Sequence, residues 1–143
     1  MKQYYFPQTI FPVRISAREY ATLVAQIPEG SVLTSKTVEQ FLCHRHGVEK
    51  IELDGPLPKF YDPATRVVSV FPAEGMKPIP FYRVLSERGF VQETRSYSRE
   101  TAVEMLRQEG HEVVQSGKGF RVEGYKSRLY DLRGAFEVEG KVE

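Results

Sequence analysis

Side chains able to do nucleophilic or metal chemistry are few in this sequence, and three of them stand together at Cys43, His44 and His46. A thiolate beside an imidazole can act as a nucleophile, and the same sulfur and nitrogen atoms can bind zinc. Residues this close on one helix cannot all face one ion without distortion, and no distant fourth ligand is evident. We therefore expect a buried or half-buried helical cysteine, and we keep an enzyme that uses Cys43 as an alternative.

A second stretch, residues 79–84, is informative because its side chains cannot do such chemistry. Residues 79–84 read Ile-Pro-Phe-Tyr-Arg-Val, residues 27–34 read Ile-Pro-Glu-Gly-Ser-Val-Leu-Thr, and residues 106–110 read Leu-Arg-Gln-Glu-Gly. Between the first two of these motifs along the chain, Arg66 lies 15 positions before Phe81. In this order and at these distances, the motifs resemble the DNA-binding domain of the O6-alkylguanine-DNA alkyltransferases.

The resemblance covers roughly residues 16–112 and identifies residues 79–84 with the family's active-site hexapeptide, Ile-Pro-Cys-His-Arg-Val. Phe81 then replaces the alkyl-accepting cysteine and Tyr82 replaces the histidine, whereas Glu109 matches the glutamate that orients that histidine. Neither Phe81 nor Tyr82 supplies a thiolate, or a base near neutral pH. The resemblance therefore implies no enzyme activity at this site. In its missing cysteine the chain resembles the alkyltransferase-like proteins, which bind alkylated guanine without repairing it, although it has diverged further than they have at the histidine and the tyrosine.

The resemblance also implies a way of binding DNA. Family members extrude the damaged guanine, fill the gap with an arginine of a recognition helix, and hold the rotated phosphate with a tyrosine. Arg66 matches the arginine, and Ser35 stands in the tyrosine's place. The predicted DNA contacts are Thr34, Ser35, Arg66 and Arg83, and the predicted degenerate active-site pocket consists of Pro80, Phe81, Tyr82 and Glu109. No cofactor or metal is implied, and the expected partners are double-stranded DNA, alkylated or not, and a protein of a repair pathway.

Local signals predict three helices and a hairpin. Ser16-Ala17-Arg18-Glu19 resembles a capping box, Thr34 and Ser98 are N-cap residues, and Gly47 suits a left-handed helix end. The expected helices span residues 16–27, 34–47 and 98–110, and a β-hairpin is expected over residues 112–123.

Two further segments connect these elements. Residues 47–62 contain two prolines and two glycines and are expected to form a loop. Asp62-Pro63 is typical of an N-cap followed by proline at the first helical position, which would place Arg66 early on the recognition helix. The β-branched residues that follow, 67–71, are equally compatible with a strand. The helix therefore depends on the resemblance.

Composition frames these expectations. A chain of 143 residues with 41% hydrophobic and 12% aromatic residues predicts one globular domain, residues 1–143, with a core at 16–112 and a hairpin and tail at 113–143. No apolar run approaches the roughly 20 residues of a membrane span. The single cysteine fits a reducing compartment, so we expect a cytoplasmic protein without membrane partners. The net charge of +1 neither supports nor excludes nucleic-acid binding.

The sequence thus favours an α+β fold, a mainly helical winged-helix-like DNA-binding domain with a C-terminal β-hairpin. Two other functions stay open beside a catalytically inert DNA-binding protein. One is a winged-helix interaction module for undamaged nucleic acid or a protein partner, in which Phe81 and Tyr82 are core residues. The other is the enzyme that uses Cys43. We also expect the aromatic residues before position 16, Tyr4, Tyr5, Phe6 and Phe11, to pack onto the domain as an arm.

Overall fold

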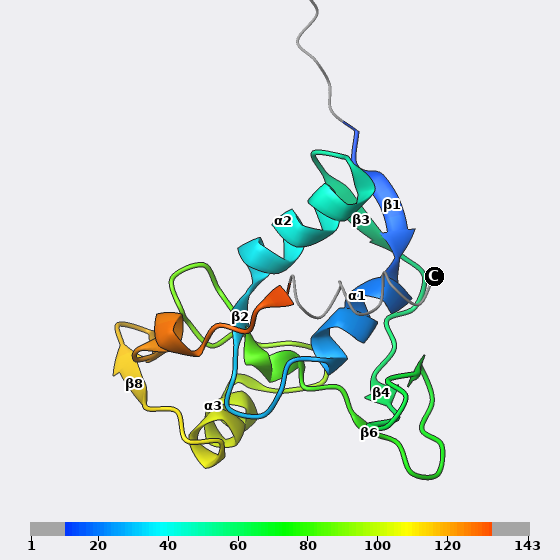
Figure 1. Ribbon diagram of the computed structural model, residues 1–143. Coiled ribbons are helices and arrows are strands. Elements are labelled where there is room, and N and C mark those ends of the chain that lie inside the picture. The colour runs from blue at the N-terminus through cyan, green and yellow to red at the C-terminus, as the bar shows by residue number, and fades with distance from the viewer. Residues whose placement is uncertain (1–10, 133–143) are drawn as a thin grey trace, which may run out of the picture.

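The computed structural model describes residues 11–132, and within that range three helices and nine short strands follow one another along the chain (Figure 1). The strands form four small sheets, with the orders β1-β3, β2-β7, β5-β4-β6 and β8-β9. The predicted α+β class is confirmed. Among these residues, no helix combines the length and the apolar character needed to cross a membrane.

The first helix, α1 (Ala17–Ala25), begins where the sequence predicts. The Ser16 hydroxyl accepts a hydrogen bond from the Arg18 backbone N–H at 3.1 Å and so satisfies one free amide of the first turn. Glu19 does not complete a capping box, because its carboxylate lies 2.9 Å from Nε2 of His46 and links α1 to the second helix. The helix ends before Pro28, as expected.

The second helix, α2 (Ser35–His46), is also confirmed, with both ends as predicted. Thr34 caps it by accepting a hydrogen bond from the Thr37 backbone N–H at 3.2 Å. At its other end Gly47 adopts a left-handed conformation with φ of 66°, which a residue without a Cβ tolerates without strain.

The third helix, α3 (Arg99–Gln108), is capped by Ser98, and the hairpin of β8 (Val113–Ser116) and β9 (Gly119–Val122) follows it. The two strands are antiparallel, with Val113 opposite Val122. Both valines are buried in one hydrophobic cluster with Leu106 of α3. Because the hairpin contributes to this core, it is an integral layer of the fold rather than an appended tail.

The prediction of a loop over residues 47–62 is wrong. It contains β3 (Ile51–Asp54), which pairs in parallel with β1 (Val13–Ser16), and β4 (Phe60–Tyr61). Parallel pairing needs a long crossover connection, here α1 and α2, and such a partner far along the chain leaves little local signal. The predicted packing of Phe11 is also wrong, since its side chain is 77% exposed. Tyr4, Tyr5 and Phe6 lie outside the described residues.

The predicted recognition helix after Asp62 is wrong as well. Asp62 Oδ1 accepts the Ala64 backbone N–H at 2.9 Å, which closes a turn instead of capping a helix. Arg66 then adopts a left-handed conformation with φ of 62°, and β5 (Val68–Ser69) returns antiparallel to β4. β6 (Lys77–Pro78) pairs with the other edge of β4. The β-branched residues after Arg66 thus favour the strand.

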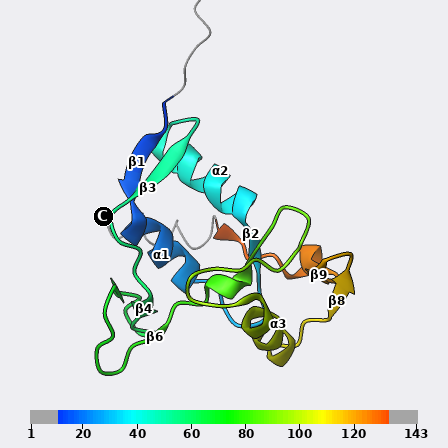
Figure 2. The same ribbon diagram turned by 180° about the vertical axis from the view of Figure 1, so that it is seen from behind.

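The hexapeptide lies between two hydrophobic clusters of the core. Its first two residues follow β6, its next three form a 3-10 turn, η1 (Phe81–Arg83), and its last residue begins β7 (Val84–Leu85). β7 pairs in parallel with β2 (Leu33–Thr34), which draws residues 27–34 alongside the hexapeptide. Figures 1 and 2 show the β4–β5–β6 sheet and the β8–β9 hairpin at opposite sides of the molecule.

The left-handed turn at Arg66 gives a first prediction. A non-glycine residue in this conformation costs roughly 1–2 kcal/mol of stability. A glycine avoids this cost, but part of the stability gained is lost because glycine has more conformational freedom in the unfolded chain. We expect Arg66→Gly to raise the free energy of unfolding by about 0.5–1 kcal/mol in urea titrations. Arg66→Ala is the control, because it removes the same side chain but keeps the Cβ. Equal stability of the two variants would contradict a strained turn.

Candidate functional site

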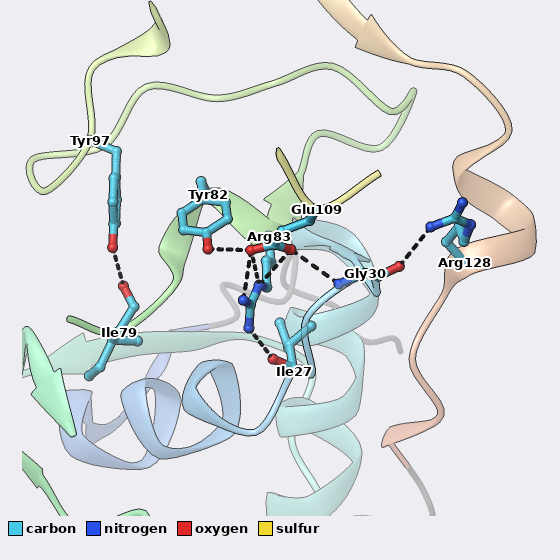
Figure 3. A network of polar contacts seen from close by, with 8 residues as sticks. All are labelled: Ile27, Gly30, Ile79, Tyr82, Arg83, Tyr97, Glu109 and Arg128. Carbon is cyan, nitrogen blue, oxygen red and sulfur yellow. Dashed lines mark hydrogen bonds and ion pairs between the residues drawn. The ribbon is translucent and has the colours of Figure 1, made fainter. Parts of the chain in front are cut away.

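One buried carboxylate, that of Glu109 at the C-terminal cap of α3, joins three distant segments of the chain (Figure 3). Its side chain is 6% exposed. Oε1 accepts a hydrogen bond from the Gly30 backbone N–H at 3.1 Å, and Oε2 accepts one from the Tyr82 hydroxyl. Loop 27–34, η1 and the end of α3 therefore meet at one acceptor group.

Arg83 completes this arrangement from the same turn as Tyr82. Its Nη2 lies 2.7 Å from Glu109 Oε2, and its Nε donates to Oε1 at 3.1 Å, a two-pronged ion pair. Its Nη1 donates to the Ile27 carbonyl oxygen at 2.6 Å. The arginine side chain is 11% exposed, so the pair is largely removed from water. We call Tyr82, Arg83 and Glu109 the Glu109 network.

The electrostatics of this network hold each group in one protonation state. Burial opposes the charge of Glu109, but hydrogen bonds from Arg83, Tyr82 and Gly30 outweigh it and lower the carboxyl pKa. Burial, and next its hydrogen bond to Glu109, raise the pKa of Tyr82 far above its ordinary range, so the phenol stays neutral. Burial also opposes the charge of Arg83, yet the hydrogen bond with Glu109 raises its pKa. The network therefore holds an ion pair and a neutral hydroxyl, with no base ready to take a proton.

An open cavity of about 380 Å³ lies beside the network. Its lining residues come from the end of α1 with the following loop, from η1, and from the β4–β5–β6 sheet with its β4–β5 turn. The lining combines aromatic rings, cations and prolines: Ala25, Gln26, Ile27, Pro28, Glu29, Tyr61, Pro63, Arg66, Lys77, Pro78, Pro80, Tyr82, Arg83, Tyr97 and Met105.

Two of the cavity's tyrosines hold each other in place. The rings of Tyr82 and Tyr97 meet edge to face, with their centroids 5.0 Å apart and their planes at 77°. The Tyr97 hydroxyl donates to the Ile79 carbonyl oxygen at 3.2 Å, and Tyr82 is fixed by Glu109 (Figure 3). Aromatic pairs of this geometry stabilise beyond their buried area. The cavity therefore presents a pre-formed aromatic wall.

The structure brings part of the predicted pocket together. Pro80 and Tyr82 line the cavity, and Glu109 lies behind Tyr82. Phe81 does not, so its predicted place in the pocket is wrong: it is 4% exposed and its ring stacks on Tyr20 in the core, with centroids 6.2 Å apart. In a 3-10 turn successive side chains diverge by about 120°. Phe81 therefore packs in the first hydrophobic cluster, whereas Tyr82 packs in the second and lines the cavity.

The predicted DNA contacts are divided between two places. Arg66 and Arg83 both line the cavity, although Arg83 is engaged with Glu109. Thr34 is buried as the cap of α2, and Ser35 is exposed and borders a separate hollow beside Tyr20.

Sequence reasoning did not predict most of the lining residues, and Tyr61, Lys77 and Tyr97 are the ones among them that matter for the chemistry of the cavity. Tyr61 directly precedes the Asp62-Pro63 turn, and Lys77 lies two positions before the start of the hexapeptide. Those positions next to recognised motifs are the signal that could have found them. Tyr97 has no comparable sequence signal, because only the fold of the 86–98 loop brings it against Tyr82.

Cys43 is half-buried on α2, as predicted. Burial and, to a lesser degree, the neighbouring Glu39 raise its thiol pKa, which disfavours the reactive thiolate. It borders a hollow with His44 and Lys50, and it is not part of the cavity beside Glu109. Within residues 11–132 no three metal-ligating side chains converge.

Comparison with known proteins gives limited results. No protein-family model matches the chain. No curated protein sequence matches it significantly. Among solved structures it is similar to S. pombe Atl1 in complex with damaged DNA containing O6-carboxymethylguanine, with 19% identity, a TM-score of 0.47, and coverage of 79% of this chain and 95% of that one. It is also similar to the S. pombe ATL in complex with DNA, with 15% identity, a TM-score of 0.49, and coverage of 80% and 94%. With identities and TM-scores this low, we draw no functional conclusion from the likeness.

The Glu109 network predicts a large loss of stability when its acceptor is neutralised. Glu109→Gln leaves the Arg83 charge buried without a counter-ion, and we expect the free energy of unfolding to fall by about 3 kcal/mol. Glu123→Gln is the control, because Glu123 lies 2.6 Å from Arg121 but both side chains are about 40% exposed. That surface pair should cost less than about 1 kcal/mol. Similar losses in denaturant titrations would show that the buried network is not a major source of stability.

The same network predicts how stability depends on pH. The folded-state pKa of Tyr82 lies above its ordinary value of 10.0, so its contribution is present at neutral pH and is lost as the pH rises beyond that value. The pKa of Glu109 lies below its ordinary 4.5, so its contribution is lost as the pH falls through that region. Burial, and next the positive charge of Arg128, lower the pKa of His111. Its contribution to stability therefore begins to be lost as the pH falls below its ordinary value of 6.5.

Tyr82→Phe should weaken the alkaline decline and leave the acid decline in place. Tyr20 and Tyr97 also have pKa values raised by burial, so the decline is reduced and not abolished. Free energies of unfolding measured from pH 4 to pH 11 for both proteins test this. Parallel curves above pH 10 would mean that Tyr82 titrates alike in the folded and unfolded states.

Proposed function

We propose that this chain is a catalytically inert, alkyltransferase-like DNA-binding protein that receives an alkylated guanine in the cavity beside Glu109. The convergence on Glu109 carries the proposal. The three motifs that resemble the family in sequence, residues 27–34, 79–84 and 106–110, are far apart along the chain. In the fold, Gly30, Arg83 and Glu109, one from each motif, share a single set of hydrogen bonds. Motifs matched by chance would not be expected to meet at one carboxylate.

The chemistry of the site supports inertness. Alkyl transfer needs a thiolate and a route for its proton. Phe81 is buried against Tyr20, and the Tyr82 hydroxyl donates its proton to Glu109 with a strongly raised pKa. Cys43, with its raised thiol pKa, borders a different hollow. No group in the cavity is equipped to accept an alkyl group.

The size and lining of the cavity suit an extruded base. About 380 Å³ lies within the range of small-ligand pockets, which are typically about 300–1,000 Å³. Tyr61 and Tyr97, both half-buried, offer ring surfaces on which a purine and its alkyl substituent can pack, and stacking on aromatic side chains is a common source of affinity for unpaired bases. Enzymes and sensors of base damage gain selectivity because a lesion is cheaper to unpair.

The arrangement also supports a winged-helix-like mode of contact. α3 is followed directly by the β8–β9 hairpin, and exposed Lys118 stands in the hairpin's turn. In this proposal the hairpin acts as the wing, and Lys118 contacts a backbone phosphate, which positions the protein without reading sequence.

Binding measurements test the proposal. Fluorescence anisotropy is measured with labelled duplexes that differ only by one O6-methylguanine, at two salt concentrations. We expect the lesion duplex to bind roughly tenfold more tightly, and Arg66→Ala to remove that preference. Lys50→Ala is the control, because this exposed lysine lies beside β3 and borders the hollow of Cys43. After incubation with lesion DNA, mass spectrometry should find the protein's mass unchanged.

Each part of the proposal can fail separately. A gain of one alkyl group in mass would disprove inertness, and loss of that gain in Cys43→Ser would assign the activity to the cysteine. Absence of binding to either duplex would disprove the DNA function.

One observation favours a second function, an interaction module for undamaged DNA or a protein partner. Phe81 and Tyr82 are each 4% exposed and contribute to the two hydrophobic clusters, as expected if the former active site has become part of the core. Equal, salt-sensitive affinity for both duplexes would support the DNA form of this module.

A further inference from the structure

The cavity is lined by two cationic side chains that form no ion pair with any described residue. Arg66 and Lys77 line it together with Arg83, but only Arg83 is committed to Glu109. Among the described residues, neither Arg66 nor Lys77 has a carboxylate within ion-pair distance, and both are exposed. Cations gathered on a cavity wall without counter-ions favour an anionic ligand.

The sheet fixes where these cations stand. Lys77 on β6 is directly opposite Tyr61 on β4. Arg66 lies in the turn that leaves β4, where its backbone N–H donates to the Asp62 carbonyl oxygen at 2.6 Å. Tyr61 therefore has one cation on the neighbouring strand and another in its own turn, and all three line the same cavity. The left-handed backbone at Arg66 is the strained feature of this turn, and such strain gathers at functional sites.

We infer that Arg66 and Lys77 form a clamp for the phosphate of the extruded nucleotide, and that Tyr61 between them is a stacking platform for its base. This rests on the proposed function and changes one part of it. The resemblance gives the arginine a gap-filling role on a recognition helix. Here Arg66 is held in a turn against the cavity, beside a second cation, where its charge serves the nucleotide that has left the helix.

The charges around the cavity place the phosphate on the sheet side. Glu29, on the loop after α1, also lines the cavity, and its carboxylate repels a phosphate placed beside it. Arg83 is neutralised by Glu109 and adds little net charge. Two cations from the sheet segment and a carboxylate from the loop after α1 favour a nucleotide oriented with its phosphate towards β6 and the β4–β5 turn.

Salt dependence tests the clamp. Each phosphate contact steepens the fall of log affinity with log salt by about 0.9. We expect Arg66→Gln and Lys77→Gln each to reduce this slope by about one for the O6-methylguanine duplex and to leave it unchanged for unmodified duplex, where no nucleotide is extruded. Tyr61→Leu should weaken the lesion complex about tenfold without changing its slope. Lys50→Gln is the control and should change neither quantity.

Arg66→Lys separates the clamp from gap filling. A lysine serves a phosphate as a point charge, whereas it lacks the planar group with which arginine stacks between bases. Arg66→Lys should therefore keep the lesion preference and the salt slope of the wild type. Circular dichroism and thermal melts confirm that every variant is folded.

The outcomes distinguish this inference from the function on which it rests. If the wild type prefers lesion DNA but Arg66→Lys loses that preference as fully as Arg66→Gln, the arginine acts by its planar group and the clamp is disproved while the function stands. If the slope is unchanged in Lys77→Gln, Lys77 is not part of a clamp. If the wild type shows no lesion preference, both the lesion-binding function and the clamp fall.

Discussion

The buried ion pair of Arg83 and Glu109 is the constraint on which the rest of this structure depends. A carboxylate that is 6% exposed is costly unless its acceptor sites are filled, and here backbone Gly30, the Tyr82 hydroxyl and the Arg83 guanidinium fill them. These donors come from residues far apart along the chain. The end of α3, the 3-10 turn and the loop after α1 must therefore assemble together, because leaving any one out would leave a buried charge unsatisfied.

The contacts that satisfy Glu109 also decide what the site can do. The Tyr82 hydroxyl donates a hydrogen bond to the carboxylate, and the charge of Arg83 is paired with it, so both side chains are engaged within the network. The other charged side chains that line the cavity are Glu29 and the two cations of the neighbouring sheet, Arg66 and Lys77, and Tyr61 and Tyr97 add aromatic surface. In the proposed function this lining serves recognition by stacking and charge.

The sequence predicted well wherever a local interaction decides the structure. Ser16, Thr34 and Ser98 cap the helices they were expected to cap, because a hydroxyl and an amide within three residues suffice. It failed where a distant partner decides. β3 exists because β1 pairs with it across α1 and α2, and the segment after Asp62 is a turn because β4 offers β5 a partner. The Phe81 error has another origin: neighbouring residues were assigned to one pocket although a 3-10 turn separates their side chains.

Ile79 explains how the sheet that carries the cations is held to the Glu109 network. This fully buried residue donates its backbone N–H to the Lys59 carbonyl oxygen at 2.8 Å and accepts the Tyr97 hydroxyl at its own carbonyl. Its side chain packs in the first hydrophobic cluster with Val68 of β5. Ile79 thus links β4, β5 and the paired rings of Tyr82 and Tyr97. The hexapeptide therefore has a structural role: it holds the rings of Tyr82 and Tyr97 in a fixed position relative to the sheet that carries Arg66 and Lys77, and a binding site needs such a fixed arrangement.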